Sequence, residues 1–262
     1  SPHQCKSEIL RRYAPQNDMG WQDEQSHCVT PVIDTTGSSS YNEGVYSPTC
    51  SNKPMPTSKV DYDQHHLHRV RRWGERGRQG PLRGLNLKGA DLSGIDLAGA
   101  DLTGTQLDLA NLEGANLSGA RLLGTSLRQA NLQGADLTRA NLSRAFLNDA
   151  RLIQARLTGA QLIRAWLTNC DATHADVSRA NLAGARLQEA RLHGTNLAGA
   201  DLTGAVLIGA DLTGADLTDA ILDEATLWWA DLRQAHGLEA ARWHNTDIDR
   251  CRLPANFEPA LS

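Results

Sequence analysis

The sequence has few aromatic residues and no long apolar segment. Aromatic side chains make up 5% of its 262 residues, and only two of them are phenylalanine. No run of 18 apolar residues occurs, which argues against a transmembrane helix. The first residues, Ser1-Pro2-His3, begin neither a basic region nor an apolar stretch, so no secretory signal is visible. We therefore expect a soluble, cytoplasmic protein.

The usual signatures of catalysis and of metal binding are also missing. The five cysteines include no C-x-x-C pair, and an odd, loosely spaced set favours reduced intracellular thiols. The sequence has no G-x-S-x-G, no phosphate-binding glycine loop and no H-E-x-x-H. We predict that the chain is not an enzyme and that it has no catalytic residues, no cofactor and no metal site.

What the sequence does have is a repeat of five residues. From Leu82 to Leu232 an aliphatic residue occupies every fifth position, 31 in all, and only Ala172 and Val177 among them are not leucine. A small residue, usually alanine, lies two positions earlier, as in the unit Ala90–Gly94. Self-similarity at a short fixed period indicates a stacked solenoid.

Neither the helical period nor strict strand alternation fits this repeat. The alanine and the leucine alternate once, and an additional residue follows at which glycine is frequent. Glycine tolerates tight turns and positive φ. The pattern predicts a short extended piece with both apolar side chains inward, followed by a corner. Pieces from successive coils would then pair at about 4.7–4.9 Å.

Units of the form A-(D/N)-L-x-x resemble the pentapeptide-repeat proteins over residues 81–253. The resemblance implies an all-β fold, a right-handed quadrilateral β-helix with four pentapeptides in each coil. Some members of this family bind type II topoisomerases as mimics of DNA, and others regulate cell differentiation. We expect the repeated leucines in the core, represented by Leu92, Leu112, Leu132, Leu152, Leu192, Leu212 and Leu232.

The repeat divides the chain into five segments. Residues 1–60 are polar, without periodicity, and are predicted to be a disordered tail. After Ala235 the apolar frame shifts by one residue, which predicts a bulge and a degenerate terminal coil. The remaining segments are a short helix and basic linker over 61–80, the regular β-helix over 81–235, the degenerate coil over 236–253 and a C-terminal tail over 254–262.

The segment 61–80 contains three features of interest. Leu67, Val70 and Trp73 recur at helical spacing, with Asp61 or Asp63 as N-cap, and predict a helix that covers the open first coil. A histidine group and an arginine run could suggest a metal or nucleic acid, but a solvated cluster and a solvated linker are favoured. The histidines are His65, His66 and His68, and the arginines are Arg69, Arg71, Arg72, Arg76 and Arg78.

Stacking of residues 20 apart predicts an apolar patch on one face of the β-helix. Aromatic and aliphatic residues occupy outward positions that are polar elsewhere, and such a patch, if exposed, is typical of a partner surface. Residues 121–191 also carry ten arginines against five acidic residues, a basic belt between acidic ends. The candidate partner-binding residues are Phe146, Trp166, Val206, Ile208, Trp228, Trp229, Arg144, Arg164 and Arg186.

We therefore predict a non-enzymatic scaffold or regulatory module that binds an unidentified protein partner. One alternative is a DNA-mimicking binder of gyrase, which the resemblance suggests but the arginine belt opposes. Another is nucleic-acid or membrane-surface binding through the arginine-rich linker, which the net charge of −4 makes less favourable. The apolar C-terminal coils could also support a homodimer.

Overall fold

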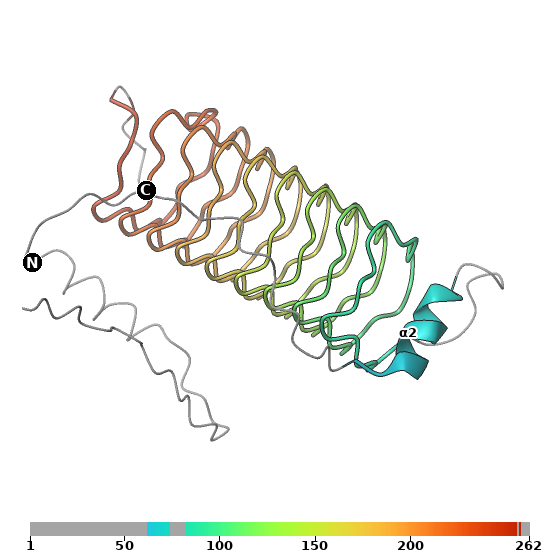
Figure 1. Cartoon of the computed structure of the whole chain (residues 1–262). Helices are drawn as coiled ribbons and strands as arrows, with labels where there is room; N and C mark the ends of the chain where they lie inside the picture. The colour runs from blue at the N-terminus through green and yellow to red at the C-terminus, as the bar shows by residue number, and fades with distance from the viewer. Residues whose placement is uncertain (1–61, 74–81, 256, 258–262) are drawn as a thin grey trace, which may run out of the picture. The chain divides into compact units, whose positions relative to one another are not determined.

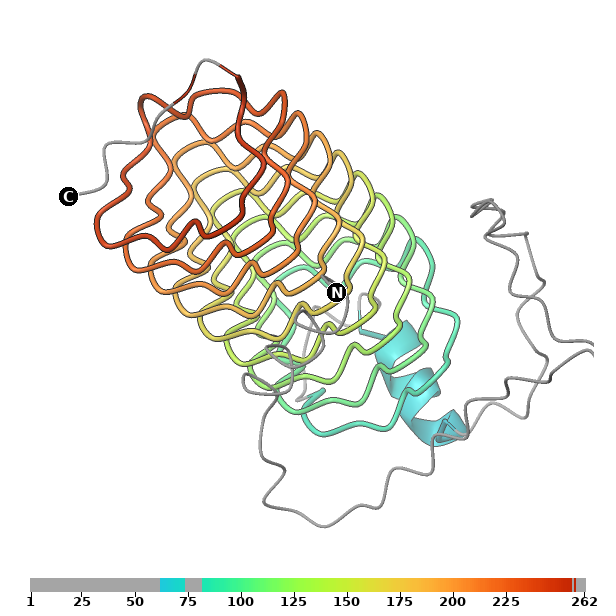
Figure 2. The ribbon, with the colours of Figure 1, turned by 90° about the vertical axis from the view of Figure 1, so that its left-hand side faces the viewer.

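The chain winds into stacked four-sided coils from Leu82 onward (Figures 1 and 2). Parallel bridges join residues 20 positions apart, from Asn86 and Gln106 to Asp216 and His236. Each coil therefore contains four pentapeptides, as the repeat predicts. The fold is a right-handed quadrilateral β-helix whose sides pair through isolated bridges, and no longer strand occurs in the described residues.

This computed structural model describes residues 62–73, 82–255 and 257. All of them belong to one unit, Pro56–Ser262. The predicted disorder of residues 1–60 lies outside the described residues, as do most of the basic linker and the end of the C-terminal tail.

Backbone hydrogen bonds tie each coil to its neighbours. The N–H of Leu92 donates to the carbonyl of Asn111 (2.7 Å), and the N–H of Asn111 donates to the carbonyl of Ala90 (2.9 Å). Within the unit, the N–H of Ala90 donates to the carbonyl of Leu87 (3.0 Å) and closes a turn. Because the same set of bonds recurs around the coil, the buried backbone is paired without long strands.

Leucine and alanine side chains fill the interior. Leu142 and Ala140 are 0% exposed. A threonine replaces alanine at a few positions, and the buried hydroxyl of Thr195 donates to the carbonyl of Ala172 (2.8 Å), so that it is not left unsatisfied. The seven representative leucines are all buried: Leu92, Leu112, Leu132, Leu152, Leu192, Leu212 and Leu232.

Every corner of the regular coils places one residue in the left-handed backbone region. This residue, the second after the core leucine, is called the corner residue below. Glycine is common there, as at Gly94 and Gly204 (both φ +63°), because it adopts positive φ without steric cost. Seventeen non-glycine residues adopt the same conformation, including Leu109 (φ 60°). Apart from Asn and Asp, which tolerate this region, each of these adds backbone strain of about 1–2 kcal/mol.

Where an aspartate or asparagine lies before a core leucine, its side chain often shapes the turn. Oδ1 of Asp201 accepts hydrogen bonds from the N–H of Thr203 (3.0 Å) and from its hydroxyl (2.6 Å). Asn116 accepts the equivalent pair from Ser118, at 3.1 and 2.7 Å. These are Asx turns. Many of the regularly spaced carboxylates therefore serve the corners.

The register changes once, after His236. Beyond it the bridges join residues 21 positions apart, as between Ile221 and Arg242. Trp243 then takes the place of a core leucine, is 5% exposed, and donates its indole N–H to the carbonyl of Leu238 (2.9 Å). The inserted residue matches the frame shift that the sequence shows.

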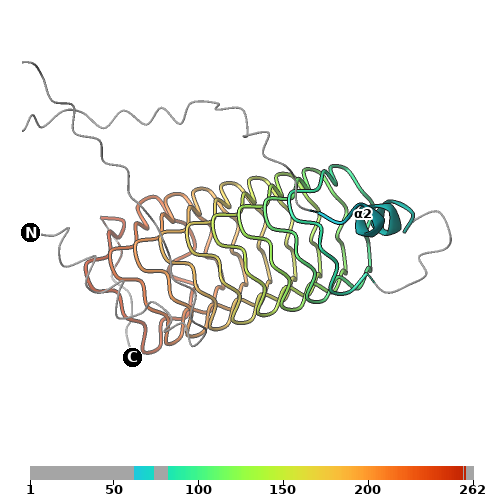
Figure 3. The same ribbon diagram turned by 60° about the horizontal axis from the view of Figure 1, so that its bottom comes forward.

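A helix closes the N-terminal end of the stack. Helix α2, Gln64–Arg71, begins after the N-cap Asp63 and lies beside the first coil (Figures 1 and 3). The N–H of Asp63 donates to the carbonyl of Asn86 (3.3 Å), and Nδ1 of His66 accepts from the N–H of Asn86 (3.1 Å). The helix thus meets backbone groups that another coil would pair. Three of its flanking and internal residues join the core: Leu67, Val70 and Trp73.

Candidate functional site

One side of the β-helix carries an unusual column of outward residues. Each lies before a core leucine, at the position that is polar in most units. Successive bridges join the members, so their backbones are neighbours in adjacent coils. We call this set the aromatic column: Ser126, Phe146, Trp166, Arg186, Val206 and Thr226.

The middle of the aromatic column is a stack of rings and guanidinium groups. The rings of Phe146 and Trp166 are 5.9 Å apart at 41°. Arg128 lies over Phe146 at 4.5 Å, and Arg186 lies over Trp166 at 4.1 Å. Nη1 of Arg186 is buried and has no hydrogen-bond partner in the described part of the chain. The face of the Trp166 indole therefore contributes to stabilising the charge of the guanidinium.

The other candidate residues lie in two separate places. Trp228 and Trp229 form an edge-to-face pair at 6.3 Å in the last regular coil, and Arg250 lies 5.4 Å over Trp229. Arg144 and Arg164 are exposed corner residues one coil apart, and neither lies over a ring. The structure therefore joins only part of the predicted site into one stack.

The repeat unit and the coil geometry agree with a known family. Five overlapping segments, which together run from residue 82 to residue 236, match the family model described as "Pentapeptide repeats". The chain belongs to the pentapeptide-repeat family. Among proteins of curated function, none matches this chain.

Several solved structures resemble this pentapeptide-repeat protein. HetL, involved in heterocyst differentiation regulation in Nostoc sp. strain PCC 7120, is 28% identical, with coverage of 72% of this chain and 96% of HetL and a TM-score of 0.45. QnrB1, a plasmid-mediated fluoroquinolone resistance protein, is 18% identical, with coverage of 67% and 87% and a TM-score of 0.55. At that identity the likeness to QnrB1 shows a shared fold alone.

The predicted exposed patch is wrong at Ile208 and overstated for its neighbours. Ile208 is 0% exposed, whereas Phe146, Trp166 and Val206 are half-buried. Trp228 and Trp229 are also half-buried. Ile208 lies one coil before Trp228 in the same column, and we attribute its burial to the larger indole beside it.

Two exposed leucines add apolar surface that lies outside the predicted site. Leu109 is 45% exposed at a corner, and Leu123 is 40% exposed beside one. The sequence signal for Leu109 was an apolar residue at a corner position where glycine is common. It went unrecognised because nothing near it in the sequence is aromatic.

One histidine and one arginine of α2 contact the first coil, whereas His65 and His68 are exposed as expected. His66 is half-buried and bonded to the first coil through Nδ1, rather than solvated as expected. Arg71 donates to the carbonyl of Asp91 (3.4 Å). Arg76 and Arg78 lie outside the described residues. In the described part of this family member, no group of three or more His, Cys, Asp or Glu side chains could hold a metal ion.

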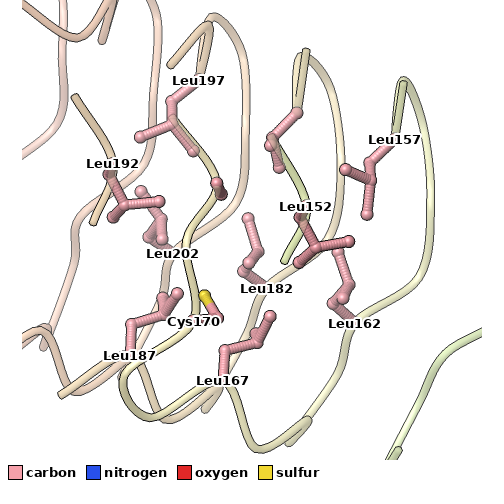
Figure 4. A pocket seen from close by; sticks show the side chains of 12 residues that line it. Leu152, Leu157, Leu162, Leu167, Cys170, Leu182, Leu187, Leu192, Leu197 and Leu202 are labelled. Carbon is pink, nitrogen blue, oxygen red and sulfur yellow. The ribbon is translucent and has the colours of Figure 1, made fainter. Parts of the chain in front are cut away.

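The core contains a small apolar cavity where the leucine frame is interrupted (Figure 4). Its volume is about 20 Å³, and Ala172, Val177 and Cys170 line it together with neighbouring leucines. Burial raises the pKa of the Cys170 thiol to about 12, so the thiol stays protonated and unreactive at neutral pH.

No helix of the described residues has the length and apolar character needed to cross a membrane.

Proposed function

We infer that this pentapeptide-repeat protein is a non-enzymatic module that binds a partner protein through the aromatic column. The observation that carries this proposal is the stack of Arg128, Phe146, Trp166 and Arg186 at outward positions that are otherwise polar. Tryptophan and arginine are the residues that most often dominate binding energy at protein interfaces.

The rigidity of the stack supports the same proposal. Backbone bridges to the neighbouring coils hold the main chain of Phe146 and Trp166, their rings contact each other, and Arg128 and Arg186 each lie against one of the rings. A partner would therefore meet side chains that have little rotamer freedom left to lose. The half-buried rings still present edges to which an apolar or aromatic group can add.

Affinity capture from the native host with matched variants tests this function. Trp166→Ser places in the column a residue that it already contains at Ser126, so the coil should remain folded. Gln133→Ser changes an outward residue on the adjacent side that carries Asn131 and is the control. We expect wild type and Gln133→Ser to retain the same partner and Trp166→Ser to lose at least about 2 kcal/mol of binding, roughly thirtyfold. Unchanged capture by Trp166→Ser would exclude the aromatic column.

The remaining candidate functions have weaker support. A gyrase-binding DNA mimic should be acidic along its length, and the ten arginines of residues 121–191 oppose it. A gyrase supercoiling assay tests this alternative directly. Direct nucleic-acid binding through the linker would have one arginine fewer to use, because Arg71 already donates a hydrogen bond to the first coil.

Self-association through the C-terminal coils stays a proposal as well. Trp243 is 5% exposed and packs against Phe257 (5.7 Å), so it offers little surface to a second copy. Trp229 is half-buried and is the better candidate. Sedimentation of wild type and Trp229→Gln would separate a dimer through this end from a monomer.

A further inference from the structure

Two neighbouring corners of the β-helix carry a pattern that the aromatic column does not explain. They flank the side whose outward residues include Asn141, Gln161 and Asn181. Between Gly99 and Gly204 these corners have twelve corner residues, eight glycines and four arginines, and no other residue type. We call the arginines the corner arginines: Arg139, Arg144, Arg164 and Arg179.

The corner arginines occupy a conformation that favours glycine. Their φ angles are 57°, 57°, 54° and 55°. Glycine takes this conformation without steric cost and does so at the other eight corners, whereas an L-residue with a Cβ is strained there. Backbone strain that the fold does not require is a reason to look for a function.

The surrounding coils leave room for the arginine side chains. A Cβ on Gly184 would come within 3.3 Å of Cγ of Arg164, and one on Gly199 would come within 3.5 Å of Cγ of Arg179. The arginine stems thus lie over the glycine of the following coil. A Cβ at Gly184 would be tight against the Arg164 stem, whereas one at Gly199 would make an ordinary contact with the Arg179 stem.

The charges of the corner arginines are not neutralised within the protein. All four side chains are exposed, and none forms an ion pair in the described residues. On the side between the two corners, Asp101 and Asp201 are separated by four coils whose outward residues include no carboxylate. Arg144 and Arg164 are one coil apart, about 4.8 Å at the backbone, so their charges repel. An anionic partner would relieve that repulsion.

We propose that this side of the β-helix, between the corner arginines, binds a short acidic segment of a partner protein. The corner arginines span only about two coil spacings, roughly 10 Å. Beyond them the same side carries Asp101, which pairs with Arg83 (3.6 Å), and Asp201, so the excess of positive charge extends over a short distance. A short acidic segment matches that length better than a long polyanion laid along the axis.

Apolar groups on the same side favour protein over phosphodiester. Leu123 is 40% exposed, and Ile163, at the equivalent position two coils later, is half-buried. An acidic segment that also carries a leucine or a valine could bury them, which a sugar-phosphate backbone could not. This surface is separate from the aromatic column, and its occupancy does not depend on the function proposed above.

The test measures binding of a short fluorescent peptide of glutamate and leucine to the full chain at low ionic strength. The first variant replaces all four corner arginines by glycine. Because glycine suits these corners, the variant should melt no lower than wild type. We expect its affinity for the peptide to fall at least about tenfold, since four exposed ion pairs are removed.

Two controls separate this site from general charge. Arg144→Gly/Arg164→Gly is compared with Arg151→Gln/Arg156→Gln, which removes the same charge from other sides of the same coils. Gln129→Gly/Gln154→Gly relieves the same backbone strain without changing charge and should bind like wild type. A weakening of several fold is expected only for the corner pair.

Four results would overturn the proposal. One is equal weakening by the Arg151/Arg156 control, which would mean a diffuse charge effect. A second is tighter binding of a short single-stranded oligonucleotide than of the peptide, and a third is preferential binding to phosphatidylserine vesicles. The last is the absence of measurable peptide binding at low salt.

Discussion

The regular coils up to Ala235 and the terminal coil over 236–253 fill the same core with different residues. In the regular coils leucine recurs in a 20-residue register, and Leu142 is 0% exposed. In the terminal coil the register is 21, and Trp243, Ile248 and Leu253 take the leucine positions. Of these, only Trp243 is buried.

The difference follows from the number of neighbours. A regular coil has another coil on both sides, so a leucine suffices to fill its share of the core. The terminal coil has a coil on one side only. There a tryptophan, whose indole N–H is bonded to the carbonyl of Leu238 and whose ring packs against Phe257, covers more of the open end.

Truncation of one core side chain in each region should give the largest difference in unfolding free energy between the regular coils and the terminal coil. Leu142→Ala removes a fully buried side chain between two coils and should cost about 2–5 kcal/mol of unfolding free energy. Ile248→Ala removes a half-buried one and should cost less, about 1–2 kcal/mol. Urea unfolding followed by circular dichroism measures both. Equal costs would mean that the terminal coil is packed as firmly as the regular ones.

Two glycines with the same conformation test the shifted register. A Cβ on Gly237 (φ +71°) would overlap the backbone nitrogen and Cα of Thr218, whereas a Cβ on Gly204 (φ +63°) meets nothing within 4 Å. Gly204→Ala should therefore cost only the strain of positive φ, about 1–2 kcal/mol. Gly237→Ala should cost more, on the order of 3 kcal/mol, because backbone must move. Thermal unfolding of the two variants gives the ranking, and a similar melting temperature for both would contradict it.

The sequence predicts the features that repeat. Leucine at a constant interval leads to the coil, the buried core and the stacking of residues 20 apart, and the single frame shift leads to the bulge after Ala235. These predictions succeed because each depends on residues within one unit or on the unit one coil away.

What the sequence does not predict depends on contacts between unlike elements or on side-chain size one coil away. Ile208 and Trp166 both occupy outward columns, yet only Ile208 is fully buried, which we attribute to the size of Trp228 one coil later. His66 bonds to Asn86 only because α2 packs on the first coil. The turn role of Asp201 requires the corner geometry, which no composition reveals.

Val177, which replaces a core leucine inside the regular coils, allows core packing to be tested there as well. Val177 is 5% exposed and borders the cavity of about 20 Å³. Val177→Leu adds one methylene at a position that is leucine elsewhere and should stabilise the protein by up to about 0.8 kcal/mol. Ala140→Val, which does not border the cavity, is the control and should destabilise by overpacking. Loss of stability in both variants would mean that the cavity cannot accept a leucine.

Acid should separate the two regions by a small margin. Hydrogen bonds from the hydroxyl and then the N–H of Thr218 lower the pKa of Asp216. The pKa of Asp231 is lowered chiefly by its hydrogen bonds to the Arg233 side chain and further by the charge of Arg252. Because Arg252 belongs to the terminal coil, Asp231 helps to hold that coil in place. A carboxylate with a lowered folded pKa contributes stability above its unfolded pKa near 3.9, and the contribution is lost as pH falls through the folded pKa.

The corresponding amides make this measurable. Asp216→Asn keeps an oxygen that accepts the turn hydrogen bond, as asparagine does in other units. Only the charge is lost, and because solvent screens it, the unfolding free energy at pH 7 should fall by no more than a few tenths of a kcal/mol. Asp231→Asn loses the ion pairs that join it to Arg233 and Arg252 and should lower the melting temperature at pH 7 by more. As the pH falls from the unfolded pKa near 3.9 through the lowered folded pKa of each carboxyl, both variants should approach wild type, because the carboxyl groups become protonated. A difference between Asp231→Asn and wild type that persists at low pH would show that the bond geometry of Asp231, rather than its charge, holds the last coil.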